Sequence, residues 1–194
     1  MLHPNIHRNY STNQETLLGQ DGAVAIASYS DSVQPNFAKQ AVAKVSAANF
    51  VENPQLHEEV FGPFSLVVAC KNEQEFLQVV KAIGGQLTGT VIATDSEITK
   101  YTNLINILRT KVGRLIFNGV PTGVEVCPSM QHGGPYPAST DSRFTAVGVN
   151  SIKRWARPFS FQSRPKALLP DALKDDNPLN ILREVDTVKT RAKI

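Results

Sequence analysis

The chain has 194 residues, of which 41% are hydrophobic and 19% are charged. These values are typical of a globular domain with one core, and the apolar runs are too short to cross a bilayer. Two cysteines are too few for a disulfide framework, and the N-terminus shows no signal-peptide pattern, so we expect a cytoplasmic protein. The net charge of +3 is too small to indicate a partner by itself.

Residues 1–38 are weakly patterned, with polar clusters between short apolar runs. Two short strands are expected in and after this region, at Ala23–Ala27 and Gln40–Ser46. His3 and His7 have the i, i+4 spacing of two ligands on one helical face. Pro4 and Asn5 lie between them and argue against a helix, and no third ligand follows, so no metal site is predicted.

The pattern becomes clearer at Phe64–Cys70, which is almost wholly apolar and predicts a buried strand. Asn72 stands three residues before Glu75, a spacing that predicts an N-cap at the start of a helix. Apolar residues then recur at helical spacing until Gly84-Gly85, where this helix is expected to end.

A second buried strand is predicted at Thr90–Thr94, followed by a helix capped by Asp95 and ended by Gly113. Arg114–Phe117 is the third predicted strand. Strands that alternate with helices over short joints indicate a parallel sheet with right-handed crossovers. Ligands of such sheets bind beyond the carboxyl ends of the strands, which is where residues 118–137 begin.

Residues 118–137 contain four prolines and four glycines. A long segment of this kind within a compact domain usually shapes a site. Cys127 is a nucleophile only if a base lies near it, and His132 is the one local candidate, so a lining thiol without a catalytic role is the alternative. His132-Gly133-Gly134 is similar to an esterase oxyanion hole, but the chain has no Gly-x-Ser-x-Gly motif.

The hexapeptide at residues 58–63 reads Glu-Glu-Val-Phe-Gly-Pro. A pair of glutamates before a turn is most often exposed charge. Here Gly62-Pro63 fixes the backbone and Phe61 places an aromatic ring beside Glu59. A carboxylate accepts hydrogen bonds from both hydroxyls of a ribose, and an aromatic edge can lie against a nicotinamide ring.

Residues 151–194 differ in charge from the rest. They carry ten Lys/Arg against five Asp/Glu, whereas residues 1–150 carry ten against twelve. A basic tail can bind nucleic acid, but acids and prolines interrupt this one and no nucleic-acid motif accompanies it, which favours a solvated face or a subunit contact. Val149–Trp155 is a predicted helix, and an extended tail is expected to follow it.

Several of these segments together resemble the aldehyde dehydrogenase superfamily, in particular the branch that contains 2,5-dioxopentanoate (α-ketoglutaric semialdehyde) dehydrogenases. The segments that carry the resemblance are residues 58–63, 121–127, 132–139, 141–148, Arg154-Trp155, Arg157-Pro158 and 169–179. The resemblance implies that Glu59 holds the nicotinamide ribose of NAD or NADP and that Phe61 flanks the ring. It also implies that Cys127 and His132 lie on the substrate side.

The chain departs from that family in one large respect. The family's dinucleotide-binding domain, catalytic cysteine and general-base glutamate have no counterpart here, and Cys127 does not match the nucleophile. The expected fold is therefore an incomplete parallel β-α-β sheet of the catalytic domain at residues 1–150, with an oligomerisation tail at residues 151–194.

The expected function follows from this reading. The chain is expected to be a C-terminal fragment, inactive alone, of a homo-oligomeric enzyme that oxidises an oxo-acid semialdehyde. Its expected partners are the aldehyde, the missing N-terminal segment and other subunits, but no nucleic acid or membrane. The alternatives are a non-catalytic oligomerisation module and a small-ligand-binding α/β module.

Overall fold

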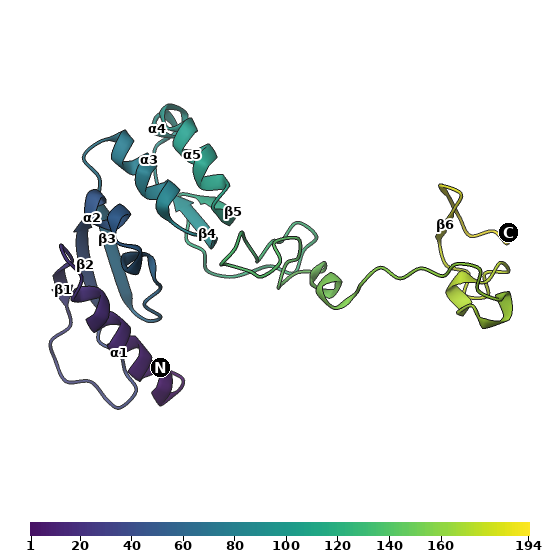
Figure 1. The fold of residues 1–194 in the computed structure, drawn as a ribbon, viewed down its shortest axis with the longest axis horizontal. Coiled ribbons are helices and arrows are strands. Elements are labelled where there is room, and N and C mark those ends of the chain that lie inside the picture. The colour runs from purple at the N-terminus through teal and green to yellow at the C-terminus, as the bar shows by residue number, and fades with distance from the viewer. The chain divides into compact units, whose positions relative to one another are not determined.

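The computed structural model describes all 194 residues, which form two compact units, Met1–Arg154 and Trp155–Ile194. All of the longer elements belong to the first unit (Figure 1). Its elements are, in order, α1 (Pro4–Leu18), β1 (Val24–Ser28), β2 (Ala41–Ser46), α2 (Ala47–Glu52), β3 (Phe64–Ala69), α3 (Glu73–Ala82), β4 (Gln86–Val91), α4 (Asp95–Lys100), α5 (Thr102–Arg109) and β5 (Val112–Phe117). None of the helices combines the length and the hydropathy that a bilayer crossing requires.

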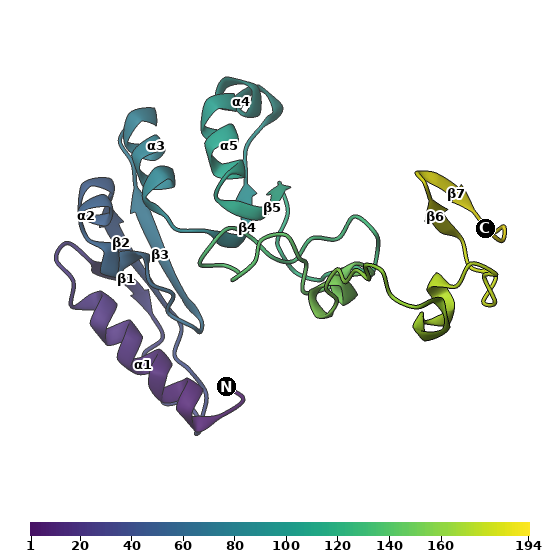
Figure 2. The ribbon, with the colours of Figure 1, turned by 45° about the vertical axis from the view of Figure 1, so that its right-hand side comes forward.

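The strands of the first unit form two small sheets, which Figure 2 shows from a second direction. One has the order β1-β2-β3, in which β1 is antiparallel and β3 parallel to β2, and the other is the parallel pair β4-β5. The predicted α/β class with parallel strands is thus confirmed. However, β3 pairs with β2 and not with β4. The sequence did not predict this pairing, because an apolar run does not indicate which strand lies next to it.

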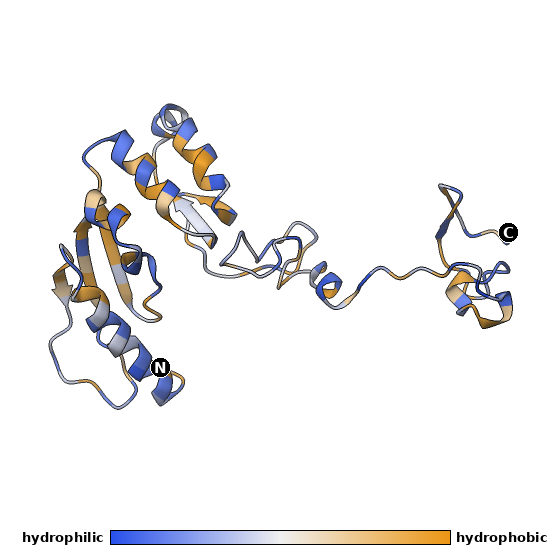
Figure 3. Ribbon diagram, in the orientation of Figure 1, coloured by the Kyte–Doolittle hydropathy of each residue, from blue (hydrophilic) through white to orange (hydrophobic).

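The main core lies between the first sheet and the helices around it. Ala41, Ala43 and Val45 are buried on alternate positions of β2, as the period of two along a strand requires. Val45 packs in a cluster with Leu17, Ala47, Phe50, Leu56 and Val79, so that α1, α2 and α3 all contribute to it. Figure 3 shows hydrophobic segments in β2 and β3, whereas β4 is pale.

The helix α1 was not expected from the sequence. It begins at Pro4, and the ring nitrogen Nδ1 of His3 accepts a hydrogen bond of 3.1 Å from the backbone N–H of Asn5. The prediction that Pro4 and Asn5 oppose a helix was wrong, because proline at the first helical position has no N–H that the helix needs. His3 therefore caps the helix.

The helix ends show which capping predictions hold. The Asn72 side chain accepts from the Glu75 backbone N–H at 3.0 Å, so the predicted cap of α3 is confirmed. Thr94, and not Asp95, caps α4, and it forms a reciprocal capping box with Glu97. The second helix is also divided into α4 and α5, and Gly113 lies inside β5 rather than at the helix end.

A hydrogen bond of the Tyr10 side chain connects α1 with the loop before β2. Its side chain is only 2% exposed, and its hydroxyl donates to the Lys39 carbonyl at 2.6 Å and accepts from Gln14 Nε2 at 3.1 Å. Burial also raises the pKa of this hydroxyl. Tyr10→Phe removes the hydroxyl that bonds to the Lys39 carbonyl and the Gln14 amide, and it should lower the free energy of unfolding in urea by about 1–2 kcal/mol.

Tyr29→Phe is the matched control for this prediction. Tyr29 is 45% exposed, and its hydroxyl has no hydrogen bond. Its replacement should leave the unfolding midpoint within about 0.5 kcal/mol of the starting protein, as is usual for surface sites. Equal effects of the two substitutions would show that the Tyr10 hydroxyl does not hold α1.

The second unit, Trp155–Ile194, has no apolar core. It contains 3₁₀ turns at Lys166–Leu168 and Asp171–Leu173 and an antiparallel hairpin of β6 (Arg183–Val185) and β7 (Val188–Thr190). Its one buried residue is Asn177, whose amide donates to the carbonyls of Ile181 and Arg191. The helix predicted at Val149–Trp155 is a single 3₁₀ turn at Ser151–Trp155.

Candidate functional site

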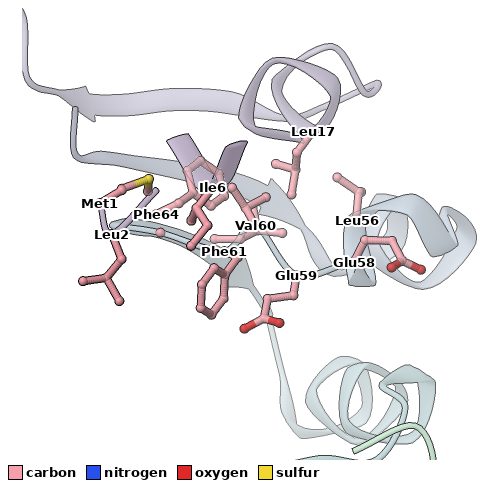
Figure 4. Close-up of a pocket in the computed structure, with 12 residues that line it drawn as sticks. Met1, Leu2, Ile6, Leu17, Leu56, Glu58, Glu59, Val60, Phe61 and Phe64 are labelled. Atoms are coloured by element: carbon pink, nitrogen blue, oxygen red, sulfur yellow. The ribbon is translucent and has the colours of Figure 1, made fainter. Parts of the chain in front are cut away.

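The Glu59–Phe61 segment lies on an open cleft between the 3₁₀ turn Pro54–His57 and β3. Both side chains are exposed, and Phe61 keeps 63% of its surface accessible. They line a cavity of about 620 Å³ whose other walls come largely from α1 and β3. In Figure 4 the side chains of Glu59 and Phe61 extend in the same direction, whereas Glu58 extends in another.

Gly62 is required by the packing beneath this segment. A Cβ atom at this position would overlap the ring of the buried Tyr10, so the turn rests directly on α1. The Phe64 N–H donates to the Gly62 carbonyl at 2.8 Å and closes the turn at the start of β3. The local sequence therefore fixes the backbone from which Glu59 and Phe61 project.

Residues 118–150 contain no strand or α-helix, in agreement with their proline and glycine content. Specific hydrogen bonds hold this segment in place. The Gly85 N–H donates to the Tyr136 carbonyl at 3.1 Å, and the His132 N–H donates to the buried Thr145 hydroxyl at 2.8 Å. The Ala146 N–H donates to the His132 carbonyl at 2.8 Å, so His132 is tied to residues 145 and 146 within the segment.

The two segments singled out by the sequence meet at a second cleft, of about 760 Å³. One wall carries Glu58 and Glu59, and another carries Pro137 and Ala138 of the irregular segment. Residues 84–88 form a third wall, and Pro54 and His57 complete the lining. Glu58 and Glu59 thus lie on both clefts and link the hexapeptide to the Pro/Gly-rich segment, and Glu59 is the one whose side chain extends alongside that of Phe61.

Cys127 and His132 are not joined in the structure. The Cys127 Sγ lies 3.4 Å from the Ser129 Oγ, and the His132 Nδ1 is buried without a hydrogen-bond partner. Neither residue lines either of the two clefts. The geometry therefore shows no pair of nucleophile and base, and the assignment of Cys127 and His132 to the substrate side stays a prediction.

The other thiol and the acidic groups offer no alternative chemistry. Burial, and then the charge of Glu75, raise the pKa of the Cys70 thiol, which disfavours the reactive thiolate. Hydrogen bonds from Arg143 lower the pKa of Asp141 to about 2, so this exposed carboxylate is engaged in a local pair. No three His, Cys, Asp or Glu side chains converge as a metal-binding group.

Arg114 is a candidate residue that was not predicted from the sequence. It lies near the start of β5, and its guanidinium is turned toward residues 121–130. It could have been found from the sequence, because Arg114 is the first residue of the otherwise apolar predicted strand Arg114–Phe117. A charged side chain in a buried strand requires a partner.

Comparison of sequences connects the chain with known enzymes. It is 42% identical over 195 residues to an alpha-ketoglutaric semialdehyde dehydrogenase of Acinetobacter baylyi, a match that covers 98% of this chain and 36% of that protein. It is 43% identical over 143 residues to alpha-ketoglutaric semialdehyde dehydrogenase 2 of Azospirillum brasilense, covering 74% of this chain and 27% of the relative. The chain thus spans about a third of the length of these curated relatives. No protein-family model matches it.

Solved structures show the same fold. A betaine aldehyde dehydrogenase of Staphylococcus aureus in complex with NAD+ has a TM-score of 0.57 at 18% identity, covering 80% of this chain and 29% of that one. The Delta-pyrroline-5-carboxylate dehydrogenase of Mycobacterium tuberculosis has a TM-score of 0.57 at 22% identity, covering 80% and 28%. The resemblance to aldehyde dehydrogenases is therefore confirmed by sequence and by fold.

Proposed function

We propose that this chain, which resembles aldehyde dehydrogenases over nearly its whole length, supplies the C-terminal part of an NAD(P)-dependent enzyme of that kind. The proposed reaction oxidises a short oxo-acid semialdehyde, such as 2,5-dioxopentanoate, to the acid. The observation that carries this proposal is the position of Glu59, which lies on the cleft beside Phe61 and also on the cleft that includes Pro137 and Ala138.

Glu59 and Phe61 fit the proposed role in cofactor binding. The Glu59 carboxylate is exposed and has no hydrogen bond or ion pair within the chain, so its oxygens are free to accept from two ribose hydroxyls. The exposed Phe61 ring offers a flat apolar surface to a nicotinamide. A bound nicotinamide supplies a hydride acceptor, while these two residues hold and orient it.

The substrate side is assigned to residues 118–148, including Cys127 and His132. Semialdehyde oxidation also needs a thiolate that attacks the carbonyl carbon. Neither cysteine of this chain is suited to that role, because Cys70 is disfavoured as a thiolate and Cys127 has no base beside it. We therefore assign the attacking thiolate to a part of the enzyme outside these residues.

The chain alone is expected not to oxidise aldehydes. Purified chain mixed with NAD or NADP and a series of aldehydes should produce no reduced nicotinamide above the blank, measured by its absorbance. The same assay, repeated with a dinucleotide-binding and cysteine-bearing aldehyde dehydrogenase segment supplied in trans or as a fusion, tests whether the chain completes an enzyme. Cofactor-dependent turnover by the chain alone, lost in Cys127→Ser, would make Cys127 the nucleophile and contradict the proposal.

The second unit favours a role in assembly. Trp155 is 85% exposed, and large apolar side chains at Phe159, Leu168, Leu173, Leu179, Leu182 and Val188 are exposed as well. A segment of 40 residues without an apolar core gains little stability from itself, so we assign it to contacts with other subunits of a homo-oligomer. The same surface is the observation that favours the alternative, a non-catalytic oligomerisation module.

We place the protein in the cytoplasm, where its two free thiols persist.

A further inference from the structure

Arg114 is a cation without an anionic partner. Its Nη1 lies 3.5 Å from the Gly123 carbonyl and 3.6 Å from the Met130 Sδ, and its Nη2 lies 3.5 Å from the Pro121 carbonyl. Its Nε is buried and has no hydrogen-bond partner. The guanidinium therefore faces residues 121–130, and all of its contacts are long.

These contacts satisfy the guanidinium poorly. Distances of 3.5 Å and more lie beyond the usual range of a hydrogen bond, whereas a guanidinium carries five N–H donors. The three ion pairs of the chain involve other residues, and Glu125 of the covering segment forms none with Arg114. Because a half-buried unpaired charge is unfavourable, the site is incomplete without an anion.

The surroundings of Arg114 select a small anion. Residues 121–126 are exposed, and their carbonyls form only the weak contacts described above, so an anion can replace them without breaking a strong bond. The two terminal nitrogens of an arginine together match the two oxygens of a carboxylate. In Arg114 both terminal nitrogens make only the long contacts described above, whereas the Nε is buried.

We propose that Arg114 is a specificity-determining residue that binds the carboxylate of the oxo-acid semialdehyde. This inference rests on the proposed function and names the group of the substrate that is recognised. An aldehyde without a carboxylate leaves the guanidinium unpaired, so Arg114 selects acidic aldehydes over neutral ones of similar size.

The binding of a carboxylate can be measured on the chain as it stands. Uniformly ¹⁵N-labelled chain is titrated with glutarate, and the Arg114 Nε–H resonance, assigned by its loss in Arg114→Lys, is followed by NMR. Glutarate should shift this resonance saturably and slow its exchange with water, whereas the neutral glutaramide should not. Arg114→Met should weaken glutarate binding by about tenfold or more, as for a charged hydrogen bond.

Arg109→Met is the matched control, since Arg109 is exposed on α5 and has no hydrogen-bonded partner, and it should leave glutarate binding unchanged. Circular dichroism establishes whether Arg114→Met is folded. If it is not, the shift in the unsubstituted chain and the weaker binding by Arg114→Lys decide the question.

An Arg114 Nε–H resonance that does not move, or equal glutarate binding by folded Arg114→Met, would overturn the assignment. So would an Arg114 already paired with an acidic side chain of another subunit, recognised by an Nε–H resonance that shifts with the concentration of the chain before any glutarate is added. The experiment involves no cofactor and no turnover. Failure of the cofactor role of Glu59 with intact glutarate binding would therefore refute the proposed function and leave Arg114 as a carboxylate-binding residue.

Discussion

Gly113→Ala is expected to lower the free energy of unfolding by about 3 kcal/mol or more, as for overpacking against atoms that cannot yield. A Cβ atom at this position would overlap the Gly133 carbonyl and press on the Gly134 backbone. Because the obstacle is main chain, the clash is relieved only if residues 132–134 lift away from β5. Urea unfolding followed by circular dichroism measures the loss.

Gly19→Ala is the control for this substitution. Gly19 has φ of −78°, and an added Cβ would approach no atom closer than 3.4 Å, which is ordinary contact. Its replacement should be neutral or slightly stabilising, because alanine has less conformational freedom than glycine in the unfolded chain. A Gly113→Ala variant as stable as Gly19→Ala would mean that the Pro/Gly-rich segment does not rest on β5.

The same contact explains how this segment reaches the cleft. Gly133 and Gly134 lie against β5 and β4, and the chain then continues to Tyr136, whose carbonyl accepts from Gly85. Pro137 and Ala138 follow directly and line the cleft that includes Glu59. A lifted segment should therefore change the cleft as well as the stability, which makes the Gly113→Ala variant informative about both.

Much of the fold was predictable because local rules dominate it. The strand at Phe64–Cys70 and the Asn72 cap were recognised from composition and spacing, and both occur in the structure, although β3 is half-buried rather than buried as predicted. The helix α1 was missed because its pattern is weak: its buried residues are Tyr10 and Leu17 alone, and proline near its start was interpreted as a breaker. Strand pairing was beyond prediction because side-chain alternation is the same whichever neighbour a strand has.

The candidate site was predictable in part. The hexapeptide carries its own signal, since a Gly-Pro turn after Glu59 and Phe61 restricts the backbone locally. The position of Pro137 on the same cleft as the hexapeptide could not be predicted. It depends on a hydrogen bond between the backbones of Gly85 and Tyr136, which side-chain identity does not encode. Arg114 was missed for a similar reason, since the absence of a partner becomes visible only when its surroundings are known.

Glu59→Gln is expected to weaken cofactor positioning in the active assembly proposed above. The carboxylate accepts from two ribose hydroxyls, and an amide retains one acceptor oxygen and no charge. The expected loss is about 1–3 kcal/mol, as for a hydrogen bond to a charged group. Cofactor affinity by fluorescence titration and turnover of the semialdehyde at saturating cofactor separate an effect on binding from one on orientation.

Glu58→Gln is the sharpest control, because Glu58 is the adjacent glutamate and lines the same two clefts as Glu59. Its side chain extends in a different direction from those of Glu59 and Phe61 (Figure 4). If the geometry of the segment determines the role, Glu58→Gln should leave affinity and turnover nearly unchanged, as for an exposed surface charge. Unchanged affinity and turnover in Glu59→Gln as well would show that both glutamates are surface charges, and the cofactor role of this segment would then have to be abandoned.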